Sequence, residues 1–159
     1  MVKVLFVCLG NICRSPMAEG LFIHQVAEAG LSDQFEIDSA GTSGWHEGER
    51  ADSRMRQTAG KYGIDLPSRS RPVKDSDFRN FDYILAMDES NLRDLQSRAR
   101  NVTHASAHIL KMRQFDDEAP NADVPDPYYG GRRGFDEVYE MLNRSTQQLL
   151  THIQQASEL

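Results

Sequence analysis

Residues 4–16 read Val-Leu-Phe-Val-Cys-Leu-Gly-Asn-Ile-Cys-Arg-Ser-Pro, and this stretch decides the predicted fold. The nearly continuous apolar run over residues 2–7 is typical of a strand buried on both faces of a sheet. Ser15 is a favoured helix N-cap, and Pro16 is favoured at the first helical position. The stretch therefore predicts a strand, a tight loop and a helix in direct succession.

The rest of the chain continues this alternation. Further strands are predicted at residues 35–39, 83–87 and 107–112, and further helices at 51–62, at 88–98 and along a final amphipathic segment. That last helix has one apolar face, made by Phe135, Val138, Leu142, Leu149 and Ile153. Alternating strands and helices predict an α/β fold with an open four-stranded parallel sheet and helices on both faces. Ligands bind beyond the carboxyl ends of such strands, where the segment after Val7 lies.

Length and composition favour one globular domain over residues 1–159. The net charge of −6 argues against nucleic acid or an anionic membrane as a partner. No apolar run is long enough to cross a bilayer, and the first residues do not resemble a secretory signal, so a cytoplasmic location is expected. Two cysteines cannot form a disulfide framework.

The loop between the first strand and helix has the features of a phosphate site. A helix N-terminus presents unpaired N–H groups and the positive end of the dipole, and Arg14 adds a guanidinium that can hold two phosphate oxygens. These groups and the Ser15 hydroxyl would stabilise Cys8 as a thiolate nucleophile. Gly10 and Asn11 tolerate the backbone conformations that a tight cradle needs.

Other sites fit less well. A cysteine followed by an arginine six positions later is weak evidence alone, and its specificity comes from its place between the strand and the helix. No Gly-Lys-Ser/Thr follows Gly10, so a Walker loop is a poor match. His104 and His108 have no third ligand nearby, so no metal site is predicted.

Residues 4–16 closely resemble the loop of the low-molecular-weight protein tyrosine phosphatases. Further segments that resemble this family are residues 38–44, 82–95 and 126–130. A departure lies at residues 67–71, which lack the histidine that some members have there. The resemblance implies a flavodoxin-like, phosphotyrosine phosphatase I-like fold and hydrolysis of phosphotyrosine without a cofactor or metal. The implied partners are phosphotyrosine-containing proteins, and the resemblance leaves monomer and weak dimer open.

The resemblance also implies roles for single residues. Cys8 attacks phosphorus and forms a phosphocysteine, Arg14 binds the transferring oxygens, and Asp126 acts as general acid and then general base. By sequence alone Asp126 is one of several acids in its loop, and the Asp-Pro-Tyr-Tyr context singles it out. The backbone that would cradle the phosphate belongs to Leu9, Gly10, Asn11, Ile12, Cys13 and Ser15.

Three loop aromatics, Trp45, Tyr128 and Tyr129, are candidate walls of the pocket. They could create a depth that a phenyl phosphate spans and a phosphoserine does not. Ser39, with Asn11 and Ser15, is a candidate for a hydrogen-bond network that supports the cradle. A last hypothesis is redox regulation, in which Cys13 protects Cys8 from irreversible oxidation by forming a disulfide with it.

Two alternatives stay open at this point. An arsenate reductase uses a similar loop, but its relay needs further cysteines, whereas Ala86 and Met87 occupy a region where one might be sought. A phosphotyrosine-binding module or thiol redox sensor would have no need of Asp126. Turnover distinguishes both from a phosphatase.

Overall fold

The computed structural model describes the backbone of residues 1–159 and all their side chains except those of Tyr129 and Arg132. Its elements, in chain order, are β1 (Val2–Cys8), α1 (Arg14–Glu28), η1 (Ser32–Gln34), β2 (Phe35–Gly41), α2 (Ser53–Lys61), α3 (Asp77–Asn80), β3 (Tyr83–Ala86), α4 (Glu89–Ala99), β4 (His108–Lys111), η2 (Met112–Phe115), η3 (Pro127–Tyr129) and α5 (Arg132–Ser157).

The strands form one parallel sheet in the order β2-β1-β3-β4. Val4 of β1 lies opposite Ile37 of β2 on one side and Tyr83 of β3 on the other. β1 is therefore an interior strand, which explains why its sequence is apolar throughout rather than alternating. The open four-stranded parallel sheet predicted from the sequence is confirmed.

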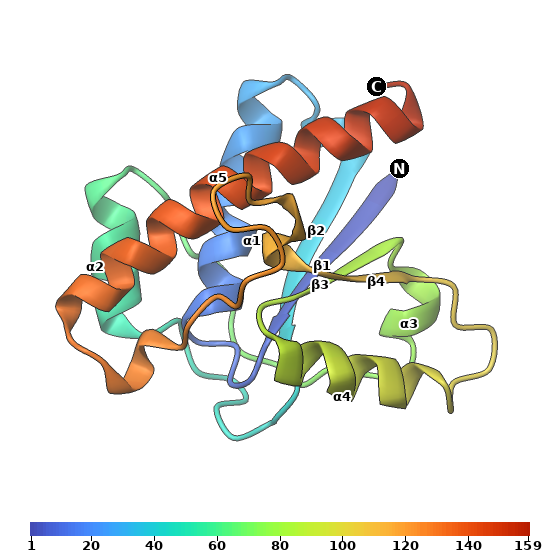
Figure 1. The fold of residues 1–159 in the computed structure, drawn as a ribbon, viewed down its shortest axis with the longest axis horizontal. Coiled ribbons are helices and arrows are strands. Elements are labelled where there is room, and N and C mark those ends of the chain that lie inside the picture. Colours follow the sequence, from blue (N-terminus) through green and yellow to red (C-terminus); the bar gives the residue numbers. More distant parts are fainter.

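Helices cover both faces of this sheet, with α1, α2 and α5 on one face and α3 and α4 on the other (Figure 1). Successive side chains of a strand point to opposite faces. Val4, Phe6 and Cys8 accordingly join the cluster under α1 and α5, while Leu5 and Val7 join the one under α3 and α4.

The long helix α5 buries the predicted apolar face completely. Phe135, Val138, Leu142, Leu149 and Ile153 are each 0% exposed. They pack in the same cluster as the buried residues of α1. Among the helices of the described chain, none is long and apolar enough to cross a bilayer.

The start of α1 differs from the prediction. The helix begins at Arg14, with Cys13 as its N-cap residue and no capping side chain, so the predicted N-cap role of Ser15 is wrong. The Ser15 hydroxyl instead bonds to groups of the loop, as described below. Pro16 still lies in the first turn, where a missing N–H costs no helical hydrogen bond.

The loops that follow the strands meet at the carboxyl edge of the sheet, at the end opposite the two termini (Figure 1). The backbone joins them directly. Thr42 N–H donates to the Cys8 carbonyl at 2.9 Å, and Met87 N–H donates to that of Val7 at 3.1 Å. Val124 N–H in turn donates to the Met87 carbonyl at 2.8 Å. The loop after β1 is thereby fixed next to residues 42, 87 and 124.

Candidate active site

The loop after β1 folds around Asn11. This residue has φ 57°, in the left-handed region, which asparagine tolerates better than most residues. Its side-chain amide donates to Ser15 Oγ at 2.7 Å and to Ser39 Oγ at 3.0 Å, and its Oδ1 accepts from Arg71 N–H at 3.0 Å. The predicted association of Asn11, Ser15 and Ser39 is present in the structure.

Gly41, at the end of β2, lets the loop after β2 approach the loop after β1 closely. A Cβ on Gly41 would lie 2.8 Å from the Leu9 carbonyl oxygen and 2.9 Å from that of Ser43. Real Cβ atoms do not approach backbone so closely, so any larger residue would push the loops apart. Ser43 N–H then donates to Leu9 O at 3.0 Å.

Cys8 lies at the floor of this loop and is 3% exposed. Its sulfur accepts a hydrogen bond from Asn11 N–H at 3.3 Å and lies 3.1 Å from Ser15 Oγ. The bond from Asn11 N–H favours negative charge on sulfur, because a hydrogen bond donated to a charged form stabilises it.

Above the sulfur, the loop offers free donors. The N–H groups of Ile12 and Cys13 donate to no acceptor in the described part of the chain, although both residues are less than 10% exposed. Both residues line the cavity that Cys8 borders, so their N–H groups are available to an anion bound there. They lie just ahead of the N-terminus of α1, where an anion is electrostatically favoured.

Arg14 is 2% exposed and is held by groups far away in sequence. Its Nη1 donates to Asp88 Oδ2 at 2.7 Å and to the Val124 carbonyl at 3.0 Å, and its Nη2 donates to Asp126 Oδ2 at 3.5 Å. Burial alone would lower the pKa of Arg14, but the negative charges of Cys8, Asp88 and Asp126 raise it above its ordinary value. A fixed cation therefore borders the loop.

Asp126 lies at the mouth of the same pocket. Its side chain is 33% exposed. Oδ1 accepts from Tyr128 N–H at 3.0 Å, and Oδ2 is the atom near Arg14. The structure brings it together with Cys8 and Arg14.

The other acids that the sequence left as rivals lie elsewhere. Asp116 is buried between Arg113 and Arg144, whose hydrogen bonds outweigh the effect of burial and lower its pKa. Asp123 pairs with Lys111 at 2.7 Å. Asp117 and Glu118 are exposed, and none of the four borders the cavity that Cys8 borders.

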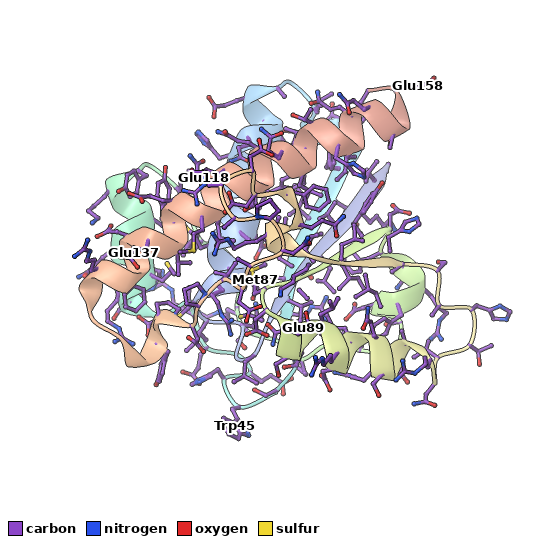
Figure 2. All side chains as sticks on the ribbon, viewed as in Figure 1. Trp45, Met87, Glu89, Glu118, Glu137 and Glu158 are labelled. Atoms are coloured by element: carbon purple, nitrogen blue, oxygen red, sulfur yellow. The ribbon has the colours of Figure 1, made fainter. Side chains whose placement is uncertain are left out.

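These groups enclose a cavity of about 50 Å³. Its floor is the loop with Cys8, Ile12 and Cys13, and its rim includes Trp45, His46 and Tyr128. Trp45 is 83% exposed, and its side chain projects from the tip of the loop that follows β2 (Figure 2). The side chain of Tyr129, the third predicted wall, lies outside the described part.

Cys13 differs from Cys8 in its electrostatics. It is buried, and burial, with smaller effects of Asp52, Cys8 and Asp126, raises the pKa of its thiol well above the usual range. Cys13 is therefore protonated at neutral pH, and both cysteines are free thiols.

Beneath the loop lies an acid that sequence reasoning missed. Glu19 is 3% exposed, and its Oε1 accepts from Ser39 Oγ and from Ser68 Oγ, each at 2.6 Å. Ser39 in turn accepts from Asn11. A chain of hydrogen bonds therefore runs from a buried carboxylate to the loop. Ser68 stands in the segment where the expected histidine is absent.

Arg54 is a second missed residue. Its guanidinium lies 5.4 Å from the ring centre of Tyr128 and 4.8 Å from that of Phe135, and it donates to the Tyr128 carbonyl at 3.3 Å. It thus joins α2 to the segment that carries Asp126. Among the described residues, no group of three or more His, Cys, Asp or Glu side chains could hold a metal ion.

Comparison with known proteins identifies this combination of an α/β sheet and a cysteine-arginine loop. The family model of low molecular weight phosphotyrosine protein phosphatases matches residues 3–159. The chain belongs to this family. It is 43% identical over 158 residues to a low molecular weight protein-tyrosine-phosphatase of Streptomyces coelicolor, covering 98% of this chain and 96% of the relative.

Solved structures of related phosphatases have the same fold as this chain. A protein tyrosine phosphatase of Entamoeba histolytica, crystallised with Hepes in its active site, superposes with a TM-score of 0.92 at 43% identity, covering 99% of both chains. A Drosophila arginine phosphatase superposes with a TM-score of 0.88 at 35% identity, covering 96% of this chain and 98% of its own.

Proposed function

We propose that this chain is a protein tyrosine phosphatase that hydrolyses phosphotyrosine and small aryl phosphates through a phosphocysteine on Cys8. The observation that carries the proposal is that Cys8 shares one cavity with Arg14 and with Ile12 and Cys13, whose N–H groups have no acceptor within the described part of the chain. A phosphate dianion needs both a nucleophile and charge stabilisation of this kind.

In the first step, the Cys8 thiolate attacks phosphorus, an S–P bond forms and the bond from phosphorus to the tyrosyl oxygen breaks. Asp126, at the pocket mouth, donates a proton to the departing oxygen. The N–H groups of residues 9–15 and Arg14 hold the three transferring oxygens through the step.

In the second step, the Asp126 carboxylate takes a proton from water, and the resulting nucleophile displaces sulfur and releases inorganic phosphate. Cys8 leaves as a thiolate, which the Asn11 N–H and Ser15 hydroxyl stabilise. Because the loop and Arg14 supply the positive charge, the cycle is expected to proceed without a metal or other cofactor.

Trp45 and Tyr128 are the proposed walls that receive the phenyl ring of the substrate. Aromatic rings pack well against another flat ring, which favours phosphotyrosine over phosphoserine. A related structure is described as an arginine phosphatase, so phosphoarginine is the rival substrate to be tested. An arsenate reductase relay is disfavoured, because the chain has only Cys8 and Cys13, and Ala86 and Met87 occupy the region where a further thiol might be sought. Figure 2 shows Met87 near the centre of the molecule.

In this proposed role, residues 1–159 are one low-molecular-weight phosphatase domain that acts as a monomer or weak dimer on phosphotyrosine-containing proteins, not on nucleic acid or membranes. A cytoplasmic location suits it, because cytoplasmic thiols are kept reduced and Cys8 must be a free thiolate.

The test is steady-state hydrolysis of p-nitrophenyl phosphate in EDTA, followed by matched peptides that carry phosphotyrosine, phosphoserine or phosphoarginine. We expect turnover in EDTA, inhibition by vanadate, and a preference for phosphotyrosine. Cys8→Ser should abolish turnover, because a serine alkoxide does not form at neutral pH. Activity restored only by a divalent ion, or Cys8→Ser turnover within tenfold of the parent, would refute the mechanism. A preference for phosphoarginine would refute the substrate.

A further inference from the structure

A second hollow, of about 390 Å³, lies beside the catalytic cavity. The two share Ile12, His46 and Tyr128 as walls. A peptide whose phosphorylated side chain reaches Cys8 can therefore extend past these residues and over the second hollow. The residues that line this hollow therefore influence which peptides can bind.

Two arginines that the proposed chemistry does not use line it. Arg50 is exposed, and its side chain makes no hydrogen bond or ion pair within the described part of the chain. Arg56 is half-buried and donates from Nε to the Ala51 carbonyl at 2.9 Å. This bond orients the guanidinium and leaves both Nη groups available.

The acids of the same hollow are already engaged. Asp52 pairs with Arg54 at 2.9 Å and also caps α2 by accepting from Arg54 N–H. Glu49 Oε2 lies 2.8 Å from His46 Nδ1. Within the described residues, neither acid bonds to Arg50 or Arg56, so the Nη groups of both arginines can still bind a carboxylate, although the whole chain carries −6.

The same two arginines border a third hollow, of about 230 Å³, that continues toward Ile64, Leu66 and one acid, Asp65. The three hollows are thus joined in sequence by shared walls, from Cys8 past His46 to Arg50 and Arg56. Such a path suits an extended segment of polypeptide better than an isolated small molecule.

We propose that the hollow lined by Arg50 and Arg56 is a subsite for an acidic side chain next to the phosphotyrosine, so that acidic phosphopeptides are the preferred substrates. The inference rests on the proposed function of the Cys8 pocket. Arginine recognises a carboxylate through two parallel hydrogen bonds, and such pairs at a binding surface act through complementarity and association rate. Because the arginines are solvent-accessible, salt weakens the preference.

The experiment compares kcat/KM for phosphotyrosine peptides of equal length that carry Asp, Asn or Lys on the N-terminal or the C-terminal side of the phosphorylated residue. The parent should prefer the Asp peptide over the Lys peptide about fivefold on at least one side, as expected from two exposed ion pairs. The preference should decline as ionic strength rises.

Three charge reversals provide the matched comparison. Arg50→Glu loses no side-chain hydrogen bond. Both Arg50→Glu and Arg56→Glu should remove or invert the preference for the Asp peptide. Both variants should still hydrolyse p-nitrophenyl phosphate, because this substrate has no flanking residue. Arg100→Glu makes the same change of charge at an exposed residue at the end of α4 and should keep the preference.

Equal kcat/KM for Asp and Lys peptides in the parent would overturn the inference. So would an equal loss of preference in Arg100→Glu, since the effect would then belong to the overall charge. A parent that failed to hydrolyse p-nitrophenyl phosphate would instead overturn the proposed function, and the subsite with it.

Discussion

Asp88 Oδ2 accepts a hydrogen bond of 2.7 Å from Nη1 of Arg14, a residue 74 positions away in the chain. The other oxygen of the same carboxylate accepts from Asn91 N–H at 2.8 Å and caps α4. One side chain thus begins a helix on one face of the sheet and orients the guanidinium that borders the cysteine loop.

Asp88→Asn separates these two roles. Asparagine caps a helix about as well as aspartate, so α4 is expected to form. The charge-assisted bond to Arg14 is lost, which loosens the guanidinium. We expect kcat/KM for p-nitrophenyl phosphate to fall about tenfold, with weaker inhibition by inorganic phosphate. An unchanged kcat/KM would show that Arg14 does not depend on Asp88 for its orientation.

Asp126→Ala tests the proposed general acid. A leaving group that is already a weak base needs no proton, so the defect should depend on the phenol that departs. We expect kcat/KM, which reports on the first step alone, to fall about a hundredfold for phosphotyrosine and much less for aryl phosphates with acidic phenols. Asp117→Asn, at an exposed acid of the preceding loop, is the control and should behave as the parent. A defect of equal size for every leaving group would remove Asp126 from this role.

Glu19→Gln tests the buried carboxylate under the loop. Burial raises the pKa of Glu19 above its ordinary value of 4.5, although the hydroxyls of Ser39 and Ser68 oppose the change. The native state therefore binds this proton more tightly than the unfolded chain does. The resulting stability is complete below pH 4.5 and is lost as pH rises through the raised native pKa.

Glutamine resembles the protonated acid at every pH. Urea unfolding of the parent and of Glu19→Gln should give free energies that diverge in favour of the variant as pH rises above the ordinary pKa of 4.5. The exposed Glu140→Gln is the control, for which no such divergence is expected. Parallel curves for the parent and Glu19→Gln would show that this carboxyl does not titrate differently on folding.

Cys13→Ser tests the hypothesis of redox protection. Peroxide converts the Cys8 thiolate to a sulfenic acid, and a neighbouring thiol then displaces hydroxide, which leaves as water, to form a disulfide. Cys13 borders the same cavity and remains a protonated thiol, so it is not itself the first target. After peroxide and then dithiothreitol, the parent should recover most of its activity and Cys13→Ser should not. Equal recovery would exclude protection by Cys13.

Local patterns predicted most of the fold. The apolar run of β1 and the periodicity of α5 are properties of contiguous residues, and both elements occur where the sequence placed them. The short helix α3 (Asp77–Asn80) was not predicted, because four residues are too few to show a helical period. The wrong N-cap at Ser15 has another cause. Its hydroxyl accepts from Asn11, whose side chain is itself held by Ser39, 28 positions away from Asn11.

The candidate site also has some residues that a local pattern reveals and others that depend on distant partners. The loop with Cys8 and Arg14 was readable because its residues are consecutive. Asp88 acts through Arg14, 74 positions away, and Arg54 acts through Tyr128, also 74 positions away. Glu19 acts through two serines that are 20 and 49 positions away. No local pattern records such contacts. Asp126 was distinguished from its neighbouring acids only by resemblance, whereas the structure separates them by position, since Asp116 and Asp123 are paired with basic residues away from the cavity.

The walls of the cavity differ from its floor in how they are attached. Cys8 ends an interior strand and is bonded on several sides. Trp45 lies at the tip of an exposed loop, and most of its ring is in solvent. A change at the tip therefore leaves the frame of the nucleophile intact. Trp45 is therefore a natural place to retarget the molecule, because a new side chain there alters what enters the cavity while the bonds that hold the loop and the sheet stay in place.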